Sequence, residues 1–258
     1  MQTLNVLVAG EGKLLPIIQD SKYLKKLYVT SDDEINGAIN IKFNTFKELA
    51  IKCKSLQIDV VLVENEKWIL QGIADVLRKN FVNCIAPTAY WAETLRDSIK
   101  SRELLVGTSI NIPRKLQYPK EFPLLVRGKG FKFVAKTLNE AIALKTNINS
   151  AFPLEIAQTT FLEELLEGEV LNIVSFFDGK TLKTFSDDKN IIEYSNALQE
   201  ILLCKKANFI GFFNSRLIYK DNKLYNAGFD LDISKIELNK DLLFILSLGI
   251  YQKLNEIL

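Results

Sequence analysis

Residues 4–12 read LNVLVAGEG, an apolar run of Leu and Val that ends at two glycines. Continuous rather than alternating hydrophobicity is typical of a strand buried on both faces of a parallel sheet. Similar apolar runs, and the helical patterns between them, lie at 27–30, 46–56, 58–63, 67–79 and 81–85. Strands that alternate with helices at this spacing form βαβ units. The sequence therefore predicts a small open α/β domain with a parallel sheet over residues 1–90.

The second half of the chain has a different pattern. A charged helix is predicted at 90–106, within a connecting segment over 91–113. Short apolar segments then predict antiparallel strands at 123–127, 131–135, 154–161, 170–177 and 181–185, and helices at 138–145, 191–205 and 240–257. Residues 209–233 read as a hairpin because Lys220-Asp221-Asn222-Lys223 is a turn sequence. We expect an α+β half over residues 114–258.

Composition excludes several classes of function. Lys and Arg number 33 against 31 Asp and Glu, so the chain has no charge surplus with which to track a nucleic acid. There is no histidine, which excludes Ser-His-Asp triads, Cys-His nucleophiles and histidine zinc sites. Cys53, Cys84 and Cys204 are far apart and are expected to be reduced. The apolar stretch 242–251 is about half the length that spans a bilayer. We expect no membrane partner and a cytoplasmic location.

A series of short fragments, in order along the chain, carries more information than any one of them. They are NVLVAGEG (5–12), IDVVLVENE (58–66), QGIADVL (71–77), APT (86–88), NIP (111–113), PLLVRGKG (123–130), TLNEA (137–141), FLEELLEGEV (161–170), FFDGKTL (176–182) and DDK (187–189). Together they resemble phosphoribosylamine–glycine ligase, an ATP-grasp enzyme of purine synthesis. The resemblance implies an ATP-grasp fold after the first domain, a lid subdomain at about 114–162, and Mg-ATP as cofactor.

The resemblance also implies which residues contact the nucleotide. Arg127 matches the first lysine of the family's glycine-rich lid, and Lys129 lies in the shortened GKG loop that would face phosphates. The segment EELLEGE matches a family linker that offers backbone groups to adenine and a carboxylate to ribose; the matched residues are Glu163, Glu164, Leu165, Leu166 and Glu169. Without the family, the same stretches are a β-turn with a solvated lysine and an acidic linker, and both alternatives stay open.

Departures from the family pattern are as informative as the matches. The family's GGREH, which binds phosphoribosylamine, corresponds to Gly12-Lys13-Leu14-Leu15-Pro16, and its GPE corresponds to Glu64-Asn65-Glu66. The two metal-ligand positions of its last strand fall on Asn226 and Gly228, and glycine has no side chain to offer. The sequence also stops before the family's C-terminal domain, which we expect to be absent. These changes predict a degenerate member of the family.

Asp230 and Asp232 offer a replacement metal site. They are two residues apart in the strand predicted at 224–233, so both carboxylates are expected on one face. Two carboxylates can hold Mg²⁺ between themselves and nucleotide phosphates. The alternative is a polar strand end or a helix cap before Ser234.

Three hypotheses for function follow. The leading one is a ligase scaffold without the parent activity that binds a nucleotide, a metabolite or a protein partner. The first alternative is an active ATP-dependent carboxylate–amine ligase with an altered substrate, working through an acyl-phosphate. The second is a structural subunit whose cleft is closed by apolar side chains, for which the candidates are Phe131, Phe133, Phe212 and Phe213, with Leu14 and Leu15 in the former phosphoribosyl loop.

Overall fold

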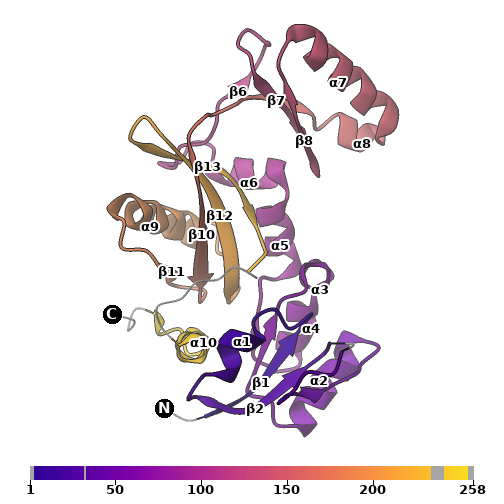
Figure 1. Ribbon diagram of the computed structural model, residues 1–258, viewed down its shortest axis with the longest axis vertical. Coiled ribbons are helices and arrows are strands. Elements are labelled where there is room, and N and C mark those ends of the chain that lie inside the picture. The colour runs from indigo at the N-terminus through magenta and orange to yellow at the C-terminus, as the bar shows by residue number, and fades with distance from the viewer. Residues whose placement is uncertain (1–2, 32, 234–240, 255–258) are drawn as a thin grey trace. The chain divides into compact units, whose positions relative to one another are not determined.

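The computed structural model describes residues 3–31, 33–233 and 241–254 and divides into two compact units (Figure 1). The first unit comprises Met1–Glu93, Val174–Asn214 and Leu231–Leu258. The second unit comprises Thr94–Ile173 and Ser215–Asp230. Each unit is therefore assembled from separate stretches of sequence, whereas the predicted domains at 1–90, 91–113 and 114–258 are consecutive segments.

The first unit contains a five-stranded parallel sheet with the order β3-β2-β1-β4-β5. Its strands are β1 (Leu4–Ala9), β2 (Leu24–Val29), β3 (Ile39–Asn40), β4 (Val60–Val63) and β5 (Cys84–Ile85). All four residues of β4 are buried, as are Val6 to Ala9 of β1, which explains why these strands read as continuous apolar runs. The predicted parallel sheet is confirmed. Only β3 was not predicted, because two exposed residues carry no periodic signal.

The helices of the first unit are α1 (Leu15–Gln19), α2 (Phe46–Ser55), α3 (Glu66–Leu70), α4 (Ile73–Lys79), α9 (Lys189–Cys204) and α10 (Leu242–Ile250). The single helix predicted at 67–79 is wrong: Gly72 has a left-handed backbone (φ 84°) that separates α3 from α4. The helix predicted at 90–106 is also two helices, α5 (Ala89–Arg96) and α6 (Ser98–Leu105), because the Asp97 side chain caps α6. No helix among the described residues is long and apolar enough to cross a bilayer.

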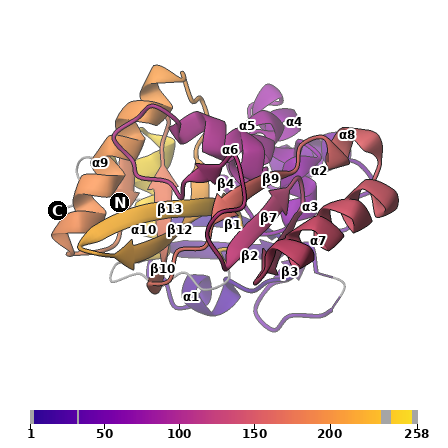
Figure 2. The same cartoon turned by 90° about the horizontal axis from the view of Figure 1, so that it is seen from above.

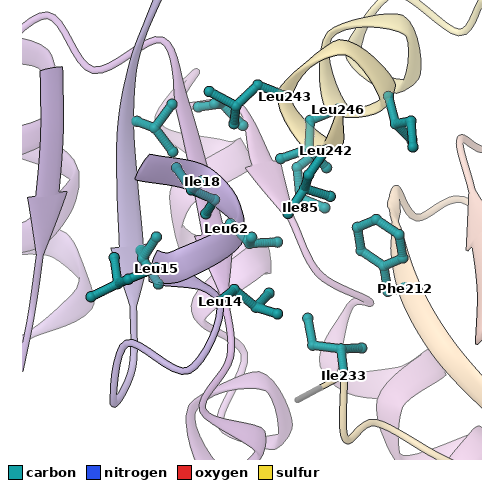
Figure 3. Close-up of a cluster of buried hydrophobic side chains, with 14 of the residues drawn as sticks. Leu14, Leu15, Ile18, Leu62, Ile85, Phe212, Ile233, Leu242, Leu243 and Leu246 are labelled. Atoms are coloured by element: carbon teal, nitrogen blue, oxygen red, sulfur yellow. The ribbon is translucent and has the colours of Figure 1, made fainter. Parts of the chain in front are cut away.

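The core of the first unit joins α1 to α10 (Figure 3). Leu14 and Ile18 are fully buried, and they belong to one cluster with Leu242, Leu243 and Leu246. The same cluster contains Phe212, Ile233, Leu62 of β4 and Ile85 of β5. The helix predicted at 240–257 is described from Leu242 to Ile250, and its apolar sequence LLFILSLGI is accounted for by this packing rather than by a membrane.

A second sheet has the order β11-β10-β12-β13. Its strands are β10 (Glu169–Phe177), β11 (Leu182–Thr184), β12 (Gly211–Lys220) and β13 (Lys223–Asp230). Strands β12 and β13 form the predicted hairpin. Its turn residues Asp221 and Asn222 have φ values of 50° and 59°, which is the left-handed backbone that a two-residue hairpin turn requires.

The second unit contains a sheet with the order β6-β9-β7-β8. Its strands are β6 (Lys115–Leu116), β7 (Leu124–Gly128), β8 (Phe131–Ala135) and β9 (Phe161–Glu164), and they pair antiparallel. Helices α7 (Leu138–Ala151) and α8 (Leu154–Ala157) lie beside β7 and β8 (Figures 1 and 2). The strand predicted at 154–161 is wrong, because the residues after Pro153 form α8 and β9 begins only at Phe161.

Candidate functional site

The turn between β1 and α1 holds a carboxylate of the same chain. The backbone N–H groups of Gly12 and Lys13 donate to Oε2 of Glu64 at 2.8 and 2.9 Å, and that of Leu14 donates to Oε1 at 2.5 Å. Consecutive N–H groups that converge on one acceptor form a nest that binds anions. Glu64 follows β4 directly, so its side chain reaches the nest from the neighbouring strand. The nest is filled from within the first unit.

The backbone around Glu64 is adapted to this contact. Gly10 has a φ of 155°, and a Cβ at this position would lie 2.9 Å from Cβ of Glu64, so a larger residue does not fit. Burial raises the pKa of the Glu64 carboxyl above its ordinary value, against the opposing effect of the three N–H donors and of Lys13. The Lys13 ammonium itself forms an exposed ion pair with Glu11 at 3.2 Å.

The side chains of the same turn point into the protein core. Leu14 is fully buried and Leu15 is 4% exposed, and Figure 3 shows both beside Ile18 in the apolar cluster of the first unit. The turn thus presents its backbone to Glu64 and its side chains to the core. The sequence GKLLP is accounted for by packing and by one internal carboxylate.

In the second unit, Glu163 is a buried carboxylate bound by two guanidinium groups. It lies on β9 with 1% of its side chain exposed. Nη1 of Arg102, on α6, is 2.7 Å from Oε1, and Nη1 of Arg127, on β7, is 2.5 Å from Oε2. Both carboxylate oxygens are therefore engaged inside the protein. The sequence assigned Glu163 to a nucleotide, and this structure gives it two arginine partners.

The Arg127 guanidinium also lies beside Asn226 and Gly228, the two positions that the resemblance matched to metal ligands. Its Nη2 donates to the carbonyl of Ala227 at 2.7 Å and lies 3.3 Å from where a Cβ of Gly228 would be. The Asn226 side chain is buried, and its Oδ1 accepts the backbone N–H of Gly228 at 2.8 Å. A fixed positive charge next to these residues repels a divalent cation. Asn226 and Gly228 therefore do not fit Mg²⁺.

The replacement metal site predicted at Asp230 and Asp232 lies at the end of β13. The strand ends at Asp230, two residues before Asp232, and the use of the two carboxylates as metal ligands stays a prediction. Asp232 follows in irregular backbone and belongs to the first unit, whereas Asp230 ends the second. Within the described part of the chain, no group of three or more Asp, Glu, Cys or His side chains is arranged to hold a metal ion.

The other predicted nucleotide contacts lie on or near β9 and in the β7–β8 turn. Lys129 is half exposed, and its Nζ is 3.9 Å from Oδ2 of Asp97. Glu164 accepts the backbone N–H of Arg114 at 2.6 Å. Leu165 and Leu166 are half-buried after β9, and Glu169 is exposed at the start of β10. The structure thus places these residues near the surface of the second unit, and their role with a nucleotide stays a prediction.

Sequence reasoning named Arg127 and missed the other positive charges that act together with it. Lys132 on β8 pairs across the hairpin with Arg127, and Arg216 lies on β12. The pKa of Lys132 is lowered by burial, by Arg216 and by Arg127, with Glu163 acting in the opposite direction. We call Arg102, Arg127, Lys132 and Arg216 the basic cluster. The pairing of 127 with 132 was readable from the short GKG turn, whereas the approach of Arg216 comes from a distant strand.

The phenylalanines proposed to close a cleft pack within the units to which they belong. Phe131 stacks on Phe133 with ring centroids 5.6 Å apart in the second unit. In the first unit, Phe212 stacks on Phe176 at 4.4 Å, and Phe213 meets another ring edge-on. Phe212 and Phe213 are buried, whereas Phe133 is 39% exposed, and closure of a cleft by these rings stays a prediction.

Both the sequence and the fold of this chain are similar to those of known proteins. No family model matches the chain. The bovine trifunctional purine biosynthetic protein adenosine-3 is 31% identical over 223 residues, which cover 73% of this chain and 22% of that protein. Phosphoribosylamine–glycine ligase from Thermotoga maritima has a TM-score of 0.67 at 14% identity, over 88% of this chain and 68% of its own. The chain belongs to the phosphoribosylamine–glycine ligase family.

The likeness extends to other enzymes with the ATP-grasp fold. The biotin carboxylase domain of Hydrogenobacter thermophilus 2-oxoglutarate carboxylase, crystallised with MgADP, has a TM-score of 0.61 at 12% identity, over 90% of this chain and 65% of its own. The present chain matches about one fifth of the length of the bovine protein. The predicted fold class, an α/β sheet domain followed by an ATP-grasp half, is confirmed.

Proposed function

We propose that this member of the ligase family binds a nucleoside polyphosphate through the basic cluster and does not carry out the amide-forming reaction of phosphoribosylamine–glycine ligase. The observation that carries the proposal is the charge of the second unit around Glu163. The guanidinium groups of Arg102 and Arg127 bind this one buried carboxylate, and the charges of Arg127 and Arg216 both act on the ammonium of Lys132. Such a surplus of positive charge attracts a polyanion, and guanidinium groups pair with phosphate oxygens in bidentate fashion.

Two internal contacts argue against the parent reaction. Forming an acyl-phosphate from ATP requires neutralisation of charge on the transferred phosphoryl group, which metal ions usually supply. Here the Arg127 guanidinium lies beside Gly228, one of the two positions matched to metal ligands, so Mg²⁺ is not expected there. In the first unit, the turn matched to the phosphoribosylamine loop is filled by Glu64. We infer that the chain keeps the basic cluster that attracts an anion and has lost the ability to form an acyl-phosphate.

Calorimetric titration of ATP in EDTA, repeated with Mg-ATP, tests the proposal. The variant Lys132→Ala/Arg216→Ala removes two members of the basic cluster and leaves the buried pairs of Glu163 in place. We expect ATP to bind without magnesium and the double variant to weaken binding at least about tenfold, because two cations leave the surface that faces the anion. The control is Lys223→Ala, an exposed lysine at the start of β13.

Two outcomes would contradict the proposal and favour one of the alternatives. Binding that requires magnesium and is abolished by Asp230→Ala/Asp232→Ala would support an active ligase that uses these carboxylates. No binding at millimolar ATP would remove the nucleotide from consideration and favour a scaffold that acts through a protein partner.

A further inference from the structure

The first unit has an open groove that neither the ligase resemblance nor the basic cluster explains. It encloses about 510 Å³ between the end of β2, the start of α2 and α3. We call this pocket the β2–α2 groove. Its lining includes Thr30, Lys42, Phe43, Phe46, Trp68 and Gln71. Its volume lies within the range of pockets that bind small molecules.

The groove lies where open parallel sheets bind their ligands. Thr30 directly follows β2, so the groove opens at the carboxyl ends of the strands. The usual crevice of such a sheet, between β1 and β4, is filled here by Glu64. The Thr30 hydroxyl accepts the backbone N–H of Gly10 at 3.0 Å, which places the groove directly beside the filled turn. A ligand that enters the first unit at this edge therefore finds the β2–α2 groove.

One wall of the groove is aromatic. The rings of Phe43 and Trp68 are 5.2 Å apart at 69°, and those of Phe46 and Trp68 are 6.5 Å apart at 71°. The wall is held in place by two helix caps: Thr45 accepts the N–H of Glu48 at 3.2 Å, and Asn65 accepts that of Trp68 at 3.0 Å. Fixed aromatic side chains favour planar ligands, which offer a π-face and bury area without ordering many torsions.

Apart from Ile41, the rest of the described lining is polar, and no residue in it is negatively charged. Gln71, at the carboxyl end of α3, brings a carboxamide with both donors and an acceptor. Lys42 brings an ammonium, whose position is fixed by a 3.3 Å hydrogen bond to the carbonyl of Ser31. Among the residues of the lining that the structure describes there is no Asp or Glu, so these residues offer no partner to a cationic ligand. The chemistry selects a planar ring that is neutral or anionic and has hydrogen-bonding groups on its edge.

We propose that the β2–α2 groove binds a nucleobase or nucleoside, with the heterocycle against Trp68 and its polar edge toward Gln71. This ligand needs no phosphate and no metal ion. The site is therefore independent of the basic cluster in the second unit, and each proposal can fail without the other.

Tryptophan fluorescence provides a direct readout. The chain has two tryptophans, and Trp91 is 4% exposed in the core, so Trp91→Phe leaves Trp68 as the only reporter. We expect adenosine, guanosine or uridine to change this fluorescence saturably. Gln71→Ala, made in the same background, is expected to weaken binding about 3- to 10-fold, the usual effect of one lost hydrogen bond. Lys67→Ala, an exposed neighbour of Trp68 outside the groove, is the matched control.

Two further measurements separate the possible results. Calorimetry of the three nucleosides with the unsubstituted chain and with Gln71→Ala gives the same comparison if Trp91→Phe fails to fold. Lys132→Ala/Arg216→Ala should leave nucleoside affinity unchanged, even where it lowers affinity for ATP. The proposal is overturned if none of the three nucleosides binds up to its solubility limit, or if Gln71→Ala binds as tightly as its parent.

Discussion

Glu64, half-buried in the first unit, and Glu163, buried in the second, both lie at places where the family resemblance leads one to expect ligand contacts. Glu64 is held by three neutral backbone N–H groups, whereas Glu163 is held by two guanidinium groups. Both sets of donors satisfy the hydrogen bonding of the carboxylate, but the net charge around the two carboxylates differs. Around Glu64 the negative charge remains uncompensated by a buried cation, and around Glu163 positive charge is in surplus. Only the second region is therefore suited to attract an anion.

Breaking the Glu163 contacts should give the largest effect. Glu163→Gln removes the charge that both arginines face and leaves two guanidinium groups largely buried, at 16% and 14% side-chain exposure. Removing one partner of a buried ion pair costs about 3–5 kcal/mol, and we expect the free energy of unfolding to fall by that amount. Urea denaturation measures it.

The neighbouring Glu164 provides the control for this experiment. It lies on the same strand, and its Arg114 partner is 59% exposed at 3.5 Å. Glu164→Gln should change stability by less than about 1 kcal/mol, as is usual for exposed ion pairs. Equal losses for the two variants would show that the guanidinium contacts of Glu163 contribute no more than a surface pair.

Emptying the β1–α1 nest should give a smaller effect. Glu64→Ala leaves three backbone donors without their acceptor, and a buried donor that loses its partner costs about 1–3 kcal/mol. Water replaces part of the loss, because the turn lies near the surface. We expect acetate or formate to raise the melting temperature of Glu64→Ala more than that of the parent chain. A variant that is as stable as the parent would mean that the contact does not hold the turn.

The pH dependence of the same contact distinguishes burial from hydrogen bonding. Burial raises the pKa of Glu64 above its ordinary value of 4.5, so between the two values the folded chain binds more protons than the unfolded chain. The stability that protonation provides is fully present below pH 4.5 and is lost as the pH rises through the folded pKa. The stability of the parent relative to Glu64→Gln should therefore fall over this range. A difference that grows with pH would show that the three donors outweigh burial.

The fold could be read from the sequence where the signal is local. The runs LNVLVA and IDVVLV predict a buried parallel sheet because both faces of each strand are apolar, and the Asp221-Asn222 turn predicts a hairpin by its backbone preference. Helix boundaries failed at Gly72 and Asp97, where one residue interrupts an apolar pattern that otherwise continues. A periodic signal averages over several residues and does not register a single break.

The candidate site was less predictable because its contacts are distant in sequence. Nothing near Glu64 indicates that its carboxylate reaches residues 12–14, and nothing near Glu163 indicates Arg102 and Arg127 as partners. The resemblance drew attention to the phosphoribosyl loop beside Glu64 and to Glu163. It assigned them external ligands, however, because the family pattern records which residue types differ and not which internal groups take their place.

The discontinuous composition of the first unit has a consequence for the order in which the chain folds during synthesis. The apolar face of Leu14, Leu15 and Ile18 is covered by Leu242, Leu243 and Leu246, more than two hundred residues later. Until α10 has left the ribosome, the part of the first unit that is already synthesised exposes this apolar face to solvent. We expect the newly made amino-terminal segment to require a holding chaperone, and its completion to be limited by translation rather than by the intrinsic speed of the parallel sheet.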